Sequence, residues 1–156
     1  MKRSEIRQHV FKIVFRTAFY PQEEWNEQID LYVEQWIDSL DETWKETHES
    51  NEENNKKEMD YLQQVRAAFD IVKQRAEKVM SQIEELDQVI ESISEGWKIG
   101  RIGKVELAIL RVAIFEMKKD EEIPVGVAIN EAVELAKVYG TEKSAKFVNG
   151  LLAKLV

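Results

Sequence analysis

The sequence predicts an all-α protein of about six or seven helices, arranged as two packed helical bundles. Apolar residues recur at spacings of three and four along most of the 156-residue chain, which is the period of an amphipathic helix. No segment shows a convincing alternation of apolar and polar residues, the pattern of a half-buried strand. A glycine-containing connector near Gly96 separates an N-terminal subdomain, residues 1–95, from a C-terminal subdomain, residues 96–156. Together they are expected to form one domain.

The first helix is expected from Arg3 to Tyr20, where Ile6, Val10 and Val14 belong to one apolar stripe. Pro21 interrupts this pattern and suits the first turn of a second helix. The apolar face of the second helix consists of Trp25, Ile29, Val33, Trp36, Ile37 and Leu40.

The segment DETWKETHESNEENNKKE, residues 41–58, is acidic and has almost no apolar anchor. We expect this acidic extension to be a solvated loop or a frayed helix extension. The helical pattern then resumes from Met59 to about Ile93. It fits one long helix or two helices joined by a kink, and Ser81 alone does not decide between these alternatives.

The connector SEGWKIGRIG precedes a strongly apolar helix that begins near Val105. Pro124 is expected to open the next helix, because proline is favoured in a first turn. Gly140 suits a left-handed cap at the end of that helix. Thr141 is a plausible N-cap for the last helix.

The last helix contains Asn149-Gly150, a dipeptide typical of hairpin turns. The flanking residues nevertheless follow a helical period. Glycine inside a helix costs about 1 kcal/mol relative to alanine. We therefore expect Gly150 to permit the close approach of a neighbouring helix and Asn149 to hydrogen-bond across that junction.

Composition excludes several classes of function. The chain has no cysteine, which rules out disulfides and thiolate metal sites, and its two histidines do not form the H-E-x-x-H zinc pattern. The glycines of the connector match no phosphate-binding loop. We therefore predict no catalytic residue, no metal site, no cofactor and no enzyme activity. The N-terminus lacks the apolar core of a signal peptide and no stretch is long enough to span a bilayer, so we expect a cytoplasmic protein without a membrane partner.

Charge is unevenly distributed along this acidic chain, whose net charge is −8. Residues 1–20 hold five basic residues and one acidic residue, whereas residues 21–60 hold fourteen acidic and three basic residues. A polyanion responds to the local field within about 8 Å at physiological salt. The average charge therefore does not exclude a nucleic-acid partner for the basic end.

Two groups of residues suggest such a partner. Lys2, Arg3 and Arg7 lie near the start of the first helix, where cations oppose the helix dipole and suggest an external anion. Near the C-terminus, basic and aromatic residues alternate, as in proteins that stack single-stranded bases on rings and hold phosphates with cations. This second group consists of Lys137, Tyr139, Lys143, Lys146 and Phe147. A solvated surface for the first group and core packing for Phe147 are the simpler alternatives.

Several motifs resemble one known family, the NusB transcription antitermination factors. They are ILRVAIFEM (109–117), IPVGVAINEAVELAKVYG (123–140) and KFVNGLL (146–152), preceded by Trp97 and RIGKVE (101–106). The segment RSEIRQHVFKIVF (3–15) is similar to the basic start of that family. The C-terminal motifs cover about 60 residues in the family's order, whereas residues 41–75 match poorly.

The resemblance implies a helical protein that binds boxA-type single-stranded RNA with NusE, a small-subunit ribosomal protein. Together they would help RNA polymerase transcribe ribosomal RNA operons through terminators. By position in the family's motifs, the implied RNA-binding residues are Lys2, Arg3, Arg7, Phe15, Lys146 and Phe147. The implied partner-binding residues are Glu106 and Lys143.

Two alternatives compete with this interpretation. The chain could be a structural protein-interaction module that forms a homodimer and has no RNA binding of its own. A similar helical domain also precedes the catalytic domain of some ribosomal RNA cytosine methyltransferases. The absence of cysteine and of a Rossmann-like segment disfavours the methyltransferase alternative.

Overall fold

The computed structural model describes all 156 residues and contains seven α-helices, two short 3₁₀ segments and no strand. The all-α prediction is therefore confirmed. The elements are α1 (Arg3–Thr17), η1 (Gln22–Glu24), α2 (Trp25–Thr47), α3 (Glu52–Ser81), α4 (Ile83–Ile93), η2 (Ile99–Arg101), α5 (Lys104–Lys119), α6 (Val125–Tyr139) and α7 (Glu142–Ala153).

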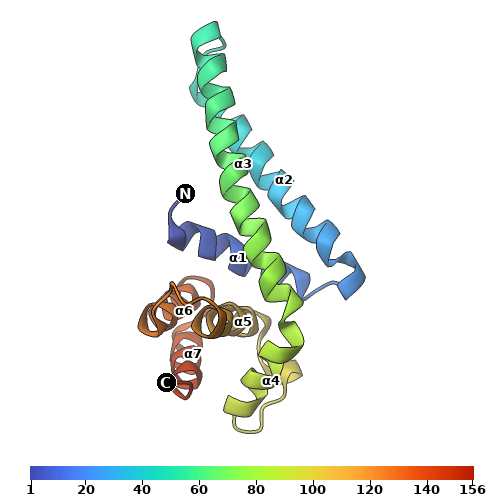
Figure 1. Cartoon of the computed structure of the whole chain (residues 1–156), viewed down its shortest axis with the longest axis vertical. Helices are drawn as coiled ribbons and strands as arrows, with labels where there is room; N and C mark the ends of the chain where they lie inside the picture. Colours follow the sequence, from blue (N-terminus) through green and yellow to red (C-terminus); the bar gives the residue numbers. More distant parts are fainter.

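Helix α5 is the central element of the fold. Every residue from Leu107 to Glu116 is buried, and the helix packs against α1, α4, α6 and α7. A helix that is buried on all sides needs neighbours on all sides. In Figure 1, α5, α6 and α7 gather at one end of the molecule and the α2–α3 hairpin extends away from them, with α1 packed between α3 and α5.

The core draws on both halves of the chain. One cluster of 33 buried apolar residues includes Phe11 and Phe69 from the N-terminal segment and Ile109 from α5. The buried guanidinium of Arg111 donates two hydrogen bonds of 2.8 Å to Asp87, which attaches α4 to the central helix. The boundary between residues 95 and 96 stays a prediction, because the core is continuous across it.

The helix ends follow local chemistry. The predicted pattern from Met59 to Ile93 belongs to two helices, because Gln82 between α3 and α4 has the non-helical ψ of 15°. Thr141 is the N-cap of α7, as predicted, and its hydroxyl accepts a hydrogen bond from the backbone N–H of Ser144. The Ser144 hydroxyl in turn accepts from the backbone N–H of Thr141, which completes a capping box.

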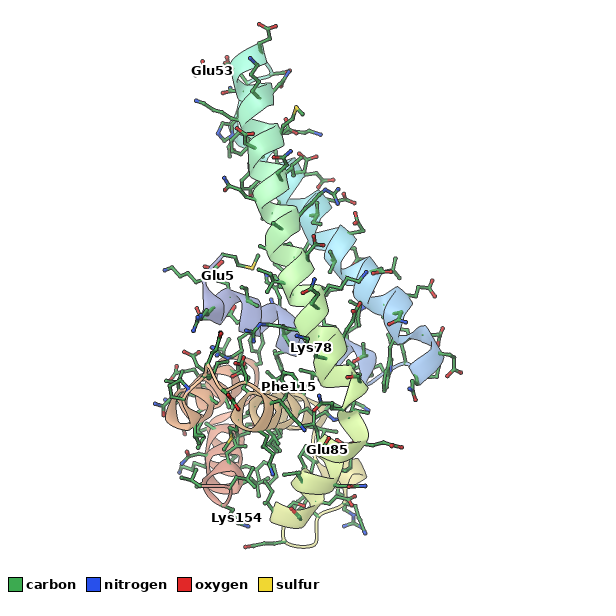
Figure 2. The ribbon with its side chains drawn as sticks, in the orientation of Figure 1. Glu5, Glu53, Lys78, Glu85, Phe115 and Lys154 are labelled. Atoms are coloured by element: carbon green, nitrogen blue, oxygen red, sulfur yellow. The ribbon has the colours of Figure 1, made fainter.

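The acidic extension continues two helices, so of its two predicted alternatives the helix extension agrees with the structure and the solvated loop does not. Residues 41–47 belong to α2 and residues 52–58 to α3, so that the turn between them is short. The missing anchor is aromatic: the Trp44 ring stacks on His48 at a centroid distance of 3.7 Å and on Tyr61 at 5.0 Å. Figure 2 shows this end of the hairpin, near Glu53, far from the helices of the C-terminal half.

Two glycine expectations were wrong. Gly140 ends α6 with a φ of −115°, outside the left-handed region. Glycine fits here because there is no room for a side chain: a Cβ would lie 2.6 Å from the Ser144 hydroxyl and 2.9 Å from the carbonyl oxygen of Ala136. A Cβ on Gly150 would meet nothing within 4 Å, and Asn149 beside it is exposed, so no helix approaches this point.

The connector after α4 is the one place where positive φ angles occur. Glu95 has a φ of 48° and Gly96 a φ of 91°. The Ser94 hydroxyl donates to the carbonyl oxygen of Trp97 at 2.7 Å and closes the turn. This turn presents Trp97 at the surface, next to the start of α5.

Candidate nucleic-acid and partner interface

The predicted site residues lie at two ends of the central helix. One group sits at the start of α1, beside Glu116 near the end of α5, and consists of Lys2, Arg3 and Arg7. The other lies around the start of α5 and on α7, and consists of Glu106, Lys143, Lys146 and Phe147. Ten residues of α5 separate Glu106 from Glu116, which places the two groups roughly 15 Å apart.

The start of α1 presents unpaired cations and free backbone donors. Lys2 and Arg3 are exposed, and neither takes part in an ion pair. The N-cap position, Lys2, has no side-chain hydrogen bond that would satisfy the first N–H groups of the helix. This end of α1 therefore combines two exposed positive charges with the positive end of the helix dipole.

Arg7 does not lie at the surface, which corrects the expectation of a free phosphate contact. Its side chain is 8% exposed, and its Nε donates to both carboxylate oxygens of Glu116 at 2.8 and 3.1 Å. Its Nη1 lies 3.4 Å from Glu131 of α6. The reason is helical geometry, because Arg7 shares the buried face of α1 with Val10 and Val14.

Glu116 is the buried carboxylate that holds Arg7. Burial raises the pKa of Glu116 above its ordinary value, and the Arg7 guanidinium acts in the opposite direction. The pair connects α1 to α5, so Arg7 positions the helix that carries Lys2 and Arg3. The apolar run around Glu116 was the signal in the sequence, since a carboxylate in such a run needs a buried cation.

Phe15 is half-buried and belongs to a row of aromatic rings along α1. Its ring lies 6.2 Å from that of Phe11 and 5.2 Å from that of Phe19. Phe19 is 57% exposed, and the Lys104 ammonium at the start of α5 lies 4.9 Å from its ring centroid. The row therefore leads from α1 toward the second group of residues.

Lys12 of α1 lies between two aromatic rings. The ammonium of Lys12 is 5.1 Å from the ring centroid of Trp36 and 5.7 Å from that of Tyr139. Tyr139, which the sequence assigned to the basic and aromatic C-terminal group, also contacts Phe11 at 5.0 Å. The C-terminal end of α6 is thus joined to the aromatic row of α1.

The second group surrounds a groove of about 270 Å³, which we call the α5–α7 groove. It lies between the connector, the start of α5 and the start of α7. Its lining includes Trp97, Arg101, Glu106, Lys143 and Phe147. Trp97 is 52% exposed, and its ring lies 6.3 Å from the half-buried ring of Phe147.

Glu106 has an internal partner at the floor of this groove. It accepts a hydrogen bond of 2.6 Å from the Ser144 hydroxyl, which also takes part in the capping box of α7. A Cβ on Gly103 would meet only the Glu106 carboxylate, which would have to shift to make room for it. Glu106 therefore fixes the start of α7 relative to α5.

Lys143 and Lys146 are exposed on α7 and form no ion pair, so both are free to bind an anion. Sequence reasoning missed Arg101 and Lys104, which contribute charge to the groove and to the aromatic row. Lys104 does not stand out in the sequence, because the ring beside it, Phe19, comes from a distant segment.

No group of three or more His, Asp or Glu side chains is placed to hold a metal ion. None of the helices combines the length and apolar character required to cross a membrane. The two groups consist of cations, aromatic rings and backbone N–H donors, which suit a polyanion with exposed bases.

Comparison with known proteins agrees with this chemistry. The model of the NusB family matches residues 4–156. The chain belongs to the NusB family. A NusB relative from Lachnoclostridium phytofermentans, named transcription antitermination protein NusB, is 41% identical over 156 residues, which are 100% of this chain and 99% of the relative.

Solved NusB structures share the fold. The structure of T. maritima NusB is similar with a TM-score of 0.73 and 26% identity, over 99% of this chain and 90% of that one. A crystal structure of antitermination factors NusB and NusE in complex with double-stranded RNA matches with a TM-score of 0.69 and 24% identity. That match covers 98% of this chain and 94% of the other, and at this identity it supports the fold alone.

Proposed function

We propose that this chain binds single-stranded boxA-type RNA together with NusE and supports termination-resistant transcription, notably of ribosomal RNA operons. The observation that carries the proposal is the presence of unpaired cations at the uncapped start of α1 and beside the aromatic α5–α7 groove. The names of NusB relatives support the same assignment, and the similar structure solved with NusE and RNA supports the fold. The proposal assigns binding, not catalysis, and a cytoplasmic site of action.

Phosphates are the natural ligands of the first group. A phosphate at the start of α1 would accept hydrogen bonds from the free N–H groups of the first turn. It would also offset the unfavourable placement of Lys2 and Arg3 near the positive end of the dipole. Arg7 contributes by holding α1 in place through Glu116.

Bases are the natural ligands of the α5–α7 groove. The rings of Trp97 and Phe147 are close enough for successive bases to stack on them, and each stacked base contributes about 1–3 kcal/mol. Arg101 and Lys143 line the groove, Lys146 precedes Phe147 on α7, and these three residues supply charge for the backbone of the same strand. The half-buried ring of Phe15 extends the surface toward α1.

NusE is the proposed protein partner, and the boundary with it includes Lys143 and the end of α5 that Glu106 organises. Because Glu106 holds Ser144, loss of its carboxylate would displace the start of α7 and with it Lys143. A partner that lengthens the RNA-binding surface raises the affinity by linkage without a new contact on this chain. The complex of both proteins with RNA would then join RNA polymerase.

Fluorescence anisotropy with labelled boxA-type RNA and a scrambled RNA, each with and without NusE, tests the proposal. We expect boxA-type RNA to bind more tightly than the scrambled strand, and NusE to increase the difference. The double variant Lys2→Gln/Arg3→Gln should weaken binding and lower the slope of log affinity against log salt by about 1.4, since each of two lost phosphate contacts on a single strand contributes about 0.7. The matched control is Lys56→Gln/Lys57→Gln, which removes two exposed charges from the far end of the hairpin.

Equal affinity for both RNAs, with and without NusE, would contradict the proposal. The homodimeric module is the alternative outcome. Light scattering that shows a stable dimer, which boxA-type RNA does not dissociate, would favour that alternative.

A further inference from the structure

A cavity of about 210 Å³ lies among α1, α3 and α5, beneath the loop that leads to α6, and we call it the α1 cavity. Apolar side chains, among them Ile6, Val10 and Phe115, form most of its wall. Its volume is below the roughly 300 Å³ at which drug-sized pockets begin, so it suits one small ring system. It lies at the opposite end of α5 from the α5–α7 groove.

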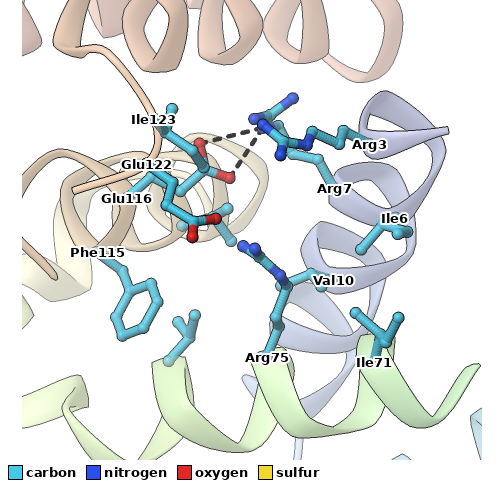
Figure 3. A pocket seen from close by; sticks show the side chains of 12 residues that line it. Arg3, Ile6, Arg7, Val10, Ile71, Arg75, Phe115, Glu116, Glu122 and Ile123 are labelled. Atoms are coloured by element: carbon cyan, nitrogen blue, oxygen red, sulfur yellow. Dashed lines mark hydrogen bonds and ion pairs between the residues drawn. The ribbon is translucent and has the colours of Figure 1, made fainter. Parts of the chain in front are cut away.

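Five charged side chains also line the α1 cavity, and only some of them are neutralised within the protein. Arg7 and Glu116 pair with each other. Arg75 uses one nitrogen for Asp120 at 3.1 Å, which leaves its other N–H groups available. In Figure 3 the Arg75 guanidinium points into the cavity, while Glu122 and Arg3 have no ion-pair partner.

We propose that the α1 cavity binds a single guanine base of the RNA, an inference that rests on the proposed function and specifies its target. The cavity joins a free carboxylate acceptor, a partly free guanidinium donor and apolar walls for the two ring faces. Guanine is the base that presents two adjacent donors, N1–H and the N2 amino group, beside the O6 acceptor. Carboxylates accept such a donor pair, and arginine is the common donor to O6.

The assignment of each group follows from this pairing. Glu122 accepts from N1–H and the amino group, and Arg75 donates to O6. Adenine, cytosine and uracil each lack the pair of adjacent donors, so the carboxylate would lose one hydrogen bond with any of them. A lost hydrogen bond to a charged group discriminates more strongly than a lost apolar contact.

The location agrees with the proposed path of the RNA. Arg3 lines the α1 cavity and also belongs to the exposed cationic start of α1. A strand whose phosphates lie at this helix end can turn one unstacked base into the neighbouring cavity. Single-stranded RNA is recognised in this way by other proteins, which hydrogen-bond the Watson–Crick edge of splayed bases.

Anisotropy measurements on oligouridine strands with one central residue changed test this inference. The central residue is guanosine, inosine, adenosine, cytidine or uridine, and binding is measured at low salt with the wild-type chain. We expect the guanosine strand to bind at least about fivefold more tightly than the others, which is the lower range for one bidentate contact. Inosine lacks the 2-amino group and should lose most of this advantage.

Variants separate the cavity from the rest of the surface. Glu122→Gln should abolish the preference for guanosine, whereas Glu121→Gln, a neighbouring exposed residue outside the lining, should keep it. Ile71→Trp places a large ring at the edge of the α1 cavity and should also abolish the preference for guanosine. Leu31→Trp is its control, because Leu31 is 42% exposed on α2, much as Ile71 is 46% exposed on α3.

Equal affinity for all five strands would overturn the guanine site and leave the proposed function intact, provided that boxA-type RNA still binds. The same conclusion holds if Ile71→Trp and Glu122→Gln keep the preference. Loss of binding to NusE alone in Ile71→Trp would instead assign the α1 cavity to an apolar side chain of the protein partner. Absence of binding to any RNA, boxA-type RNA with NusE included, would overturn the proposed function and this inference together.

Discussion

Replacing Arg7 with methionine leaves the Glu116 carboxylate buried without its cation. The two side chains are 8% and 6% exposed, and Nε of Arg7 lies 2.8 and 3.1 Å from the carboxylate oxygens. Removal of one partner of a buried pair costs about 3–5 kcal/mol. Because Glu116 can take up a proton and so avoid part of this penalty, we expect the free energy of unfolding to fall by about 3 kcal/mol at neutral pH.

The loss should depend on pH in a defined direction. Burial already raises the pKa of Glu116 in the folded state, and without Arg7 the pKa rises further. The folded state then binds the proton more tightly than the unfolded state. Stability is therefore lost as the pH rises from the unfolded value of 4.5 through the folded pKa, so the variant should be closest to wild type in acid.

Urea denaturation followed by circular dichroism, at about pH 5 and about pH 8, measures both effects. The control is Arg66→Met, which breaks an exposed pair with Glu34, whose nitrogen and oxygen lie 3.6 Å apart. An exposed pair contributes less than about 1 kcal/mol. The double variant Arg7→Met/Glu116→Leu should recover most of the loss, because no buried charge remains. If Arg7→Met costs no more than Arg66→Met, or the double variant does not recover, the reasoning is refuted.

Three further predictions concern glycine, histidine and an aromatic ring. Gly150→Ala should raise the free energy of unfolding by about 0.5–1 kcal/mol, because a Cβ at Gly150 meets nothing within 4 Å. Gly140→Ala should lower the free energy of unfolding, because a Cβ there meets Ser144 and the carbonyl oxygen of Ala136. Urea titrations compare the two variants. Burial lowers the pKa of His9 to about 4, and Lys12 adds a smaller effect in the same direction. Because the unfolded state then binds the proton more tightly, the free energy of unfolding should fall as the pH drops from about 6.5 to 4. The fall should be less steep in His9→Gln. Phe147→Ala should keep the helical circular dichroism spectrum and lose about tenfold in RNA affinity, and unchanged affinity would make this ring part of the core only.

Much of the secondary structure follows from local sequence. The cap at Thr141, the start of α6 after Pro124 and the break near Gly96 depend on residues next to one another in the chain. Local hydrogen bonds and backbone preferences decide them before any tertiary contact forms. The sequence left the acidic extension open between a loop and a helix extension, because the stacking of Trp44 on Tyr61 joins two separate helices and is not a local pattern.

The candidate site was less accessible to sequence reasoning. Lys2, Arg3, Lys143 and Lys146 are exposed, as an anion-binding role requires, although their contact with RNA stays a prediction. Arg3 and Arg7 are both arginines near the start of α1, but Arg3 is exposed and Arg7 is buried. The helical period places it on the apolar stripe, and only its pairing with a carboxylate 109 residues away explains why burial is tolerated.

The sequence by itself determined that this chain forms amphipathic helices, where several of them begin, and which family it resembles. These properties depend on periodicity, caps and the order of motifs, all of which are local. The tertiary structure alone decided that Arg7 is buried, that Trp97 faces Phe147 and that Glu122 and Arg75 line one cavity. Those contacts join segments far apart in the chain, and no local pattern encodes a distance between helices.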